Sequence, residues 1–121
     1  MKAIIDVDVR DSVYEPGATD GTILYDRPAQ NARYKVWLYL DGPDLSYVRS
    51  VTFTLHPTFP DPVRTVVRTP SNPTCALEIW TWGLFTVRVD IEDKSGEHHI
   101  VQHKLTYARD IKPNAQYRQV S

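Results

Sequence analysis

The chain has 121 residues, of which 14 are basic and 15 acidic, so its formal net charge is −1. This length fits one domain and leaves no room for a second domain of similar size. A near-neutral chain lacks the excess of basic residues that drives non-specific nucleic-acid binding or uniform attraction to an anionic membrane. We therefore expect neither nucleic acid nor membrane among its partners.

The cysteine content and the first residues indicate a cell compartment. Cys75 is the single cysteine, which excludes an internal disulfide and a cysteine-based zinc cage. No apolar run reaches the length of a membrane-spanning helix. The opening MKAIIDVDVRD places charges where a signal peptide needs an apolar stretch. We expect a cytoplasmic protein, or a nuclear one if the source is eukaryotic.

The side-chain composition favours strands over helices. Val, Ile and Thr together number 31, against 15 for Ala plus Leu. Side chains branched at Cβ are restricted in rotamer and fit a pleated surface. This ratio predicts an all-β protein.

Four strands are predicted in the first half of the chain. In residues 4–10, apolar and charged side chains alternate, as in a strand with one buried face. Turn signals then surround a short strand at 22–25. Residues 34–40 are apolar on both faces, which is typical of a central strand, and residues 47–55 form another long run.

Four more strands are predicted in the second half. Five of the nine prolines lie around a short strand at 63–68, which indicates loops and an edge strand because proline cannot donate to a ladder. Strand signals resume at 75–79. The strongest alternation follows at 85–92, and a hairpin turn connects it to a strand at 99–107.

Short strands separated by turns predict an immunoglobulin-like β-sandwich of seven to eight antiparallel strands over residues 1–107. A small barrel is the alternative. Residues 108–121 have little apolar content and are predicted to form a loosely attached C-terminal tail.

Two loop segments carry more aromatic and polar side chains than a connection needs. Residues 55–62 hold three prolines, which stiffen the segment and can present Phe59 toward solvent. The alternative is that Phe59 packs as a plug under its own loop. Residues 80–85 contain two tryptophans and Gly83, where a bulge or a close backbone approach is possible. There the alternative is two core tryptophans at a sheet edge.

These two segments resemble a YEATS domain. The family pattern is a strand with a tryptophan, then V-x-F-x-L-H-x-[ST]-F-x-x-P, then G-W-G-x-F, then an H-x-L strand. In this sequence the matching parts are Trp37, residues 51–62, residues 81–85 and residues 103–105. The resemblance spans about residues 34–107. The short hairpin and the lack of lysine-rich extensions are similar to the prokaryotic branch of the family.

The resemblance implies an immunoglobulin-type sandwich that reads acylated lysine, acetyl or crotonyl, in a peptide or protein. The partner would be a histone tail if the source is eukaryotic. Phe59 and Trp82 would then form the two aromatic walls of an open slot. The backbone N–H of Trp82 would donate to the acyl carbonyl oxygen.

The same resemblance implies a polar frame for the slot. The hydroxyl of Thr58 would hydrogen-bond the acyl amide, His56 would support it, and Gly83 would keep the wall thin. This sequence departs from the pattern at two positions. Thr81 stands where the family has glycine before the tryptophan. Arg33 stands where eukaryotic readers have another aromatic residue, with Tyr25 or Tyr34 as substitutes.

The alternative function is a scaffold or interaction module of a bacterial multi-domain signalling or defence protein, with no acyl-lysine binding. His56, Thr58 and Asp61 lie close in sequence, but the intervening prolines and the lack of a helix disfavour a nucleophilic triad. We therefore expect no enzyme.

No cofactor is expected, and no metal. His98, His99 and His103 are the one metal-like cluster. No carboxylate is close to them in spacing, and His103 shares a face with Val101 and Leu105. A hydrogen-bonded core histidine is the preferred interpretation of His103.

Overall fold

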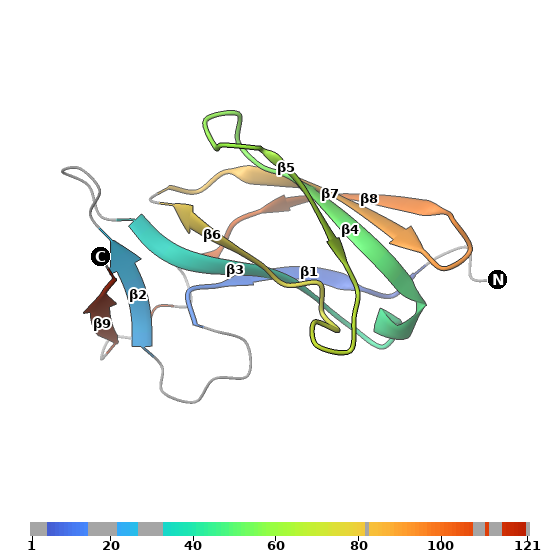
Figure 1. Cartoon of the computed structure of the whole chain (residues 1–121), viewed down its shortest axis with the longest axis horizontal. Helices are drawn as coiled ribbons and strands as arrows, with labels where there is room; N and C mark the ends of the chain where they lie inside the picture. The colour runs from blue at the N-terminus through green and yellow to red at the C-terminus, as the bar shows by residue number, and fades with distance from the viewer. Residues whose placement is uncertain are drawn as a thin grey trace.

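The structure, a computed structural model, describes residues 5–14, 22–26, 33–81, 83–107, 111 and 115–120. In these residues nine strands form two sheets that face each other (Figure 1). A short 3₁₀ helix, η1, spans Leu45–Tyr47. The strands are β1 Asp8–Ser12, β2 Thr22–Asp26, β3 Arg33–Asp41, β4 Val48–Thr54, β5 Val63–Val67, β6 Leu77–Thr81, β7 Thr86–Asp93, β8 His98–Lys104 and β9 Gln116–Gln119.

The first sheet is built around β3. Strand β6 pairs with one edge of β3, and β1 pairs with the other, because Trp37 has both Glu78 and Ser12 as register partners. Strand β2 continues along the edge that β1 occupies, beside the first residues of β3. Strand β9 pairs with β2 in parallel. The predicted antiparallel arrangement therefore holds for every described pair except this one.

The second sheet has the order β5-β4-β7-β8, with all pairs antiparallel. Its register shifts between Val48 and Ser50 of β4. Such a bulge adds one residue to the strand. As a result Val48 and Val51, three residues apart, are both buried, although strict alternation would put them on opposite faces.

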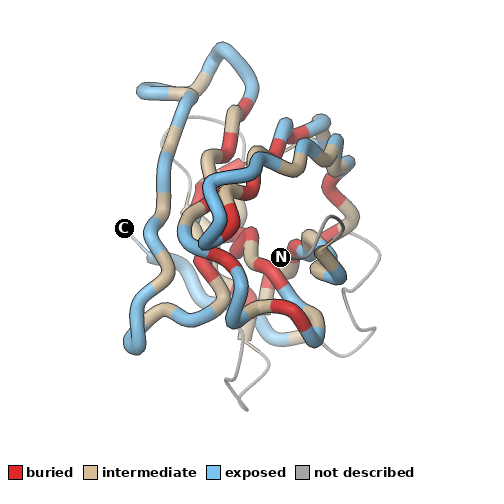
Figure 2. The backbone as a smooth tube through the Cα atoms, turned by 90° about the vertical axis from the view of Figure 1, so that its right-hand side faces the viewer, coloured by how far each residue is buried: buried red, intermediate tan, exposed pale blue. Residues whose placement is uncertain are grey.

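The core lies between the two sheets. Apolar side chains from both sheets form one buried cluster, and along β7 buried positions alternate with more exposed ones, whereas all of β9 is exposed (Figure 2). Removing these side chains from water is the main favourable term for a fold of this size. The fully buried members with the largest side chains include Phe53, Ile23, Leu38, Leu40, Ile79 and Ile91.

The predicted all-β sandwich is confirmed, with differences at four elements. Strand β8 ends at Lys104, three residues before the predicted end at residue 107. Strand β1 begins at Asp8, four residues after the predicted start. Strand β6 begins at Leu77 instead of residue 75, because Cys75 has a φ of 52°, which a strand cannot accommodate. Strand β9 was not predicted. The division of the chain at residue 107 stays a prediction.

A buried carboxylate joins the sheets at the edge formed by β1 and β8. The Asp11 side chain accepts hydrogen bonds from His103 Nε2 at 2.7 Å and from the backbone N–H of Thr106 at 2.8 and 3.0 Å. The Thr106 hydroxyl donates to the same group. These bonds fix the chain where it leaves β8, one residue before Tyr107, whose hydroxyl donates to Gly83.

Among the described residues, no helix has the length and apolar character needed to cross a membrane.

Candidate functional site

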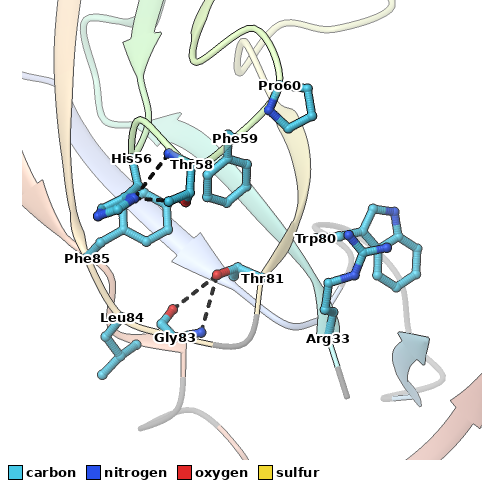
Figure 3. A pocket seen from close by; sticks show the side chains of 10 residues that line it. All are labelled: Arg33, His56, Thr58, Phe59, Pro60, Trp80, Thr81, Gly83, Leu84 and Phe85. Atoms are coloured by element: carbon cyan, nitrogen blue, oxygen red, sulfur yellow. Dashed lines mark hydrogen bonds between the residues drawn. The ribbon is translucent and has the colours of Figure 1, made fainter. Parts of the chain in front are cut away.

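A pocket of about 300 Å³ opens at one end of the sandwich (Figure 3). It lies between the loop that connects β4 to β5 and the segment that connects β6 to β7, two parts of the chain more than 20 residues apart. Most of its surface is apolar. Five of the six predicted site residues line it: His56, Thr58, Phe59, Thr81 and Gly83. The sixth, Trp82, lies outside the described residues.

Hydrogen bonds hold the β4–β5 loop in a closed shape. The backbone N–H of Leu55 donates to the carbonyl oxygen of Pro62 at 2.7 Å, which closes the base of the loop. The guanidinium of Arg64 donates to the carbonyl oxygens of Pro60 and Asp61 at 2.9 and 3.1 Å. Together with the three prolines, these bonds limit the conformations of the loop.

The polar end of the pocket is a pair formed by His56 and Thr58. The Thr58 hydroxyl lies 2.8 Å from His56 Nδ1, and the Thr58 backbone N–H donates to the same nitrogen at 3.3 Å. The backbone N–H can only donate, which fits the tautomer with an unprotonated Nδ1, and in that tautomer the hydroxyl donates to Nδ1 as well. The Thr58 oxygen therefore presents its lone pairs, and an incoming N–H donor can use them.

Phe59 both packs and lines the pocket. Its ring centroid lies 5.3 Å from that of Phe85, with the planes tilted by 51°, and His56 meets Phe85 edge-on at 6.0 Å. Phe59 is half-buried and contacts the core cluster. The ring was expected either to face solvent or to pack under its own loop. In the structure one part of the ring packs and another part faces the cavity.

The opposite wall is a backbone turn held by side chains. The Thr81 hydroxyl bonds both the N–H and the carbonyl oxygen of Gly83 at 3.3 Å. The Tyr107 hydroxyl donates to that same carbonyl oxygen at 3.1 Å. A Cβ atom at Gly83 would meet nothing within 4 Å, so glycine leaves this wall open without being required by a close contact.

Five further residues line the pocket and were not named as site residues: Arg33, Pro60, Trp80, Leu84 and Phe85. Four of them lie in the two loop segments singled out from the sequence, and Arg33 stands at the position where eukaryotic readers have another aromatic residue. Leu84 is 51% exposed, so it presents an apolar side chain at the pocket. The tyrosines considered as substitutes at position 33 do not line the pocket, and Tyr34 packs near Tyr117 instead.

Arg33 is anchored by an ion pair. Its Nε and Nη2 atoms donate to the two carboxylate oxygens of Asp26 at 3.0 and 2.7 Å. This bond raises the pKa of Arg33 above its ordinary value. The guanidinium therefore keeps its charge at every relevant pH.

Each histidine of the cluster on β8 has a carboxylate partner, so the expectation that none is close was wrong. His98, His99 and His103 bond Asp90, Asp93 and Asp11 at 2.8, 2.8 and 2.7 Å. The partners come from other strands or from across the hairpin, where spacing within β8 cannot reveal them. His103 is hydrogen-bonded and largely buried, as predicted.

Asp93, Glu97 and His99 are close enough to share a metal ion. Asp93 is already used, since Ser95 and Glu97 donate to one of its oxygens and His99 bonds the other. The hydrogen bonds from His99 and then Ser95 hold the pKa of Asp93 well below its usual range. This group therefore closes the β7–β8 turn.

Comparison with known proteins finds similarity over the part of the chain that contains both pocket segments. A family model described as the prokaryotic YEATS domain matches residues 33–106. Transcription initiation factor TFIID subunit 14 of Schizosaccharomyces pombe is 37% identical over 77 residues, which cover 59% of this chain and 30% of that protein. The chain thus spans about a third of the length of this curated relative.

Solved structures support the fold. The Yaf9 YEATS domain recognising an H3K122suc peptide has a TM-score of 0.58 at 19% identity, covering 92% of this chain and 82% of that one. The yeast AF-9 homologue Yaf9 has a TM-score of 0.56 at 18% identity, covering 84% and 69%. The Yaf9 YEATS domain bound to H3K27ac has a TM-score of 0.51 at 20% identity, covering 88% and 78%.

Proposed function

Because the chain belongs to the prokaryotic YEATS domain family, we propose that its pocket binds acylated lysine and that the domain is a non-enzymatic recognition module. The observation that carries this proposal is the pocket itself. Two segments far apart in sequence bring an aromatic ring, a free hydroxyl acceptor and an open backbone turn around one apolar cavity.

The chemistry of the pocket suits an amide and not an ammonium. Acylation converts a strongly hydrated lysine ammonium into a neutral, planar amide with one N–H donor and one carbonyl acceptor. A free ammonium entering this apolar cavity would lose its hydration shell, which is costly without a carboxylate partner. A planar amide, extended by an unsaturated acyl group, can stack on aromatic rings.

We assign the roles as follows. Thr58 accepts the amide N–H of the acylated lysine, because a hydroxyl that donates to His56 Nδ1 keeps its oxygen lone pairs for an incoming donor. Phe59 forms one aromatic wall. Trp82 is proposed as the second wall and as the backbone donor to the acyl carbonyl oxygen; it is flanked in sequence by Thr81 and Gly83, which both line the pocket.

The solved structures of relatives support acylated lysine as the class of ligand. They do not identify the protein that would carry it for this chain. Yaf9 structures hold an H3K122suc peptide in one case and H3K27ac in another, so that protein binds acylated peptides. We extend acyl-lysine recognition to this chain. The protein that carries the acylated lysine is not specified by any described residue.

Titration calorimetry with matched peptides tests the proposal. One host sequence of Gly, Ser and Ala residues carries a central lysine that is unmodified, acetylated or crotonylated. We expect saturable binding of the two acylated peptides alone. Phe59→Ala and Trp82→Ala should abolish it, whereas Tyr47→Ala, which removes an exposed aromatic ring that does not line the pocket, should leave it unchanged.

Absence of binding by the folded wild-type protein would contradict the proposal. The alternative, a scaffold module that contacts other proteins without acyl-lysine binding, would then be preferred. Equal binding of the unmodified and acylated peptides would also contradict the proposal.

A further inference from the structure

Arg33 is the one side chain with a permanent charge among the described residues that line the pocket. It extends from the first position of β3, the strand that pairs with β6, and Trp80 of β6 lines the same pocket (Figure 3). Its side chain is 31% exposed, so it is neither fully solvated nor sealed off. A permanent cation in a cavity suited to a neutral amide needs an explanation of its own.

The ion pair with Asp26 leaves much of the guanidinium unused. Arginine has five N–H donors. Two of them are taken by the two oxygens of Asp26. The other three have no partner in the part of the chain that the structure describes. Asp26 does not line the pocket, so it holds the guanidinium plane from one side while Arg33 faces the cavity.

The charge of Asp26 weakens the attraction for an anion without cancelling it. Coulomb energy falls with the first power of distance, so an anion on the pocket side, at roughly twice the distance from Asp26 as from Arg33, meets about half as much repulsion as attraction. The planar fork of a guanidinium matches a carboxylate better than any other common acceptor. The free donors therefore favour a carboxylate over a neutral group.

We infer that Arg33 binds a carboxylate of the ligand and thereby determines specificity within the pocket. This inference rests on the proposed function. The carboxylate has two sources with the same chemistry: the end of a dicarboxylic acyl chain on the lysine, or an acidic side chain next to the acylated lysine. Both bring a carboxylate to the guanidinium.

Paired peptides separate the two sources. The first pair carries succinyl-lysine or its half-amide, succinamyl-lysine, which has the same shape and no charge. The second pair carries acetyl-lysine with a neighbouring glutamate or glutamine. Each is titrated into the wild-type protein, Arg33→Gln and the matched control Lys35→Gln. Lys35 is on the same strand and pairs with Glu78, but it does not line the pocket.

We expect the wild-type protein to prefer the charged member of at least one pair by about tenfold, the order of a charge-assisted hydrogen bond at a partly exposed site. Arg33→Gln should remove that preference, measured as the ratio of the two affinities within each pair. Lys35→Gln should keep the preference. Asp26→Asn should increase it several-fold, because the repelling carboxylate is gone and an amide oxygen can still hold the guanidinium.

The inference about Arg33 would be overturned if the wild-type protein showed no preference within either pair, or if the preference persisted in Arg33→Gln. In either case, binding of acetyl-lysine by the wild-type protein would still support the proposed function. Loss of acetyl-lysine binding in every protein would overturn both.

Discussion

Replacing Asp11 with alanine should strongly destabilise the domain. The Asp11 side chain is fully buried and accepts bonds from three donor groups: the His103 ring, the Thr106 N–H and the Thr106 hydroxyl. Alanine leaves those donors without a partner in a half-buried site. An unpaired buried donor costs about 1–3 kcal/mol, and Asp11 serves three such donors. We expect a loss of about 3–5 kcal/mol, since water can reach part of the site.

Urea denaturation followed by tryptophan fluorescence measures this loss as a lower midpoint at constant slope. Asp8→Ala is the matched control, because Asp8 is on the same strand, is 70% exposed and is 3.8 Å from Arg10. Its effect should stay within about 0.5 kcal/mol. If both variants lose equally little stability, the account of Asp11 as a buried link between the sheets is wrong.

The same carboxylate predicts a dependence on pH. Burial alone would raise the pKa of Asp11, but hydrogen bonds from His103 and Thr106 outweigh it and hold the pKa below its ordinary value. The stabilisation is therefore complete above the unfolded-state pKa of about 4 and is lost as the pH falls through the lower folded-state pKa. The stability gap between wild type and Asp11→Ala should narrow below about pH 4. A constant gap down to pH 2 would contradict this.

Three further substitutions or reactions test single contacts. Thr58→Val should weaken acetyl-lysine binding about tenfold while Thr58→Ser retains it, measured by calorimetry, because only the hydroxyl can accept the amide N–H. Tyr107→Phe removes the donor to the Gly83 carbonyl oxygen and should cost about 0.5–1.5 kcal/mol of stability by urea denaturation, with weaker peptide binding. Burial raises the pKa of the Cys75 thiol to about 11, so the folded protein should not react with a thiol reagent at pH 8, and reaction should begin only on unfolding. The role of the Thr58 hydroxyl is refuted if Thr58→Val binds acetyl-lysine as tightly as the wild type. The role of the Tyr107 hydroxyl is refuted if Tyr107→Phe is as stable as the wild type, and the burial of Cys75 is refuted if the folded protein is labelled promptly.

Local patterns predicted the strands that bury one face. The alternation in β7 corresponds to Val87, Val89 and Ile91 in the core. Strand β9 could not be found in this way, because its four residues are all exposed and its existence depends on pairing with β2 about 90 residues away. The backbone of Cys75 is another such case, since nothing in its neighbours predicts a positive φ.

In the site, too, residues within one local motif could be predicted, whereas residues brought together by strand pairing could not. The loop residues His56, Thr58 and Phe59 were predicted because they lie within one motif, and the structure places them around one pocket. Arg33 and Trp80 were not predicted as lining residues. They come from neighbouring strands of the first sheet, and only the register between β3 and β6 brings them to the cavity. The link from Asp11 to His103 spans 92 residues and is likewise invisible to spacing.

Backbone amide NMR during a titration with acetyl-lysine peptide tests the central claim most directly. The unmodified lysine peptide of the same sequence serves as the control. Recognition through the pocket predicts saturable shift changes confined to residue 33 and to residues 55–60 and 80–85 with the acetylated peptide alone. Shift changes elsewhere on the sandwich, or the same changes with both peptides, would contradict it.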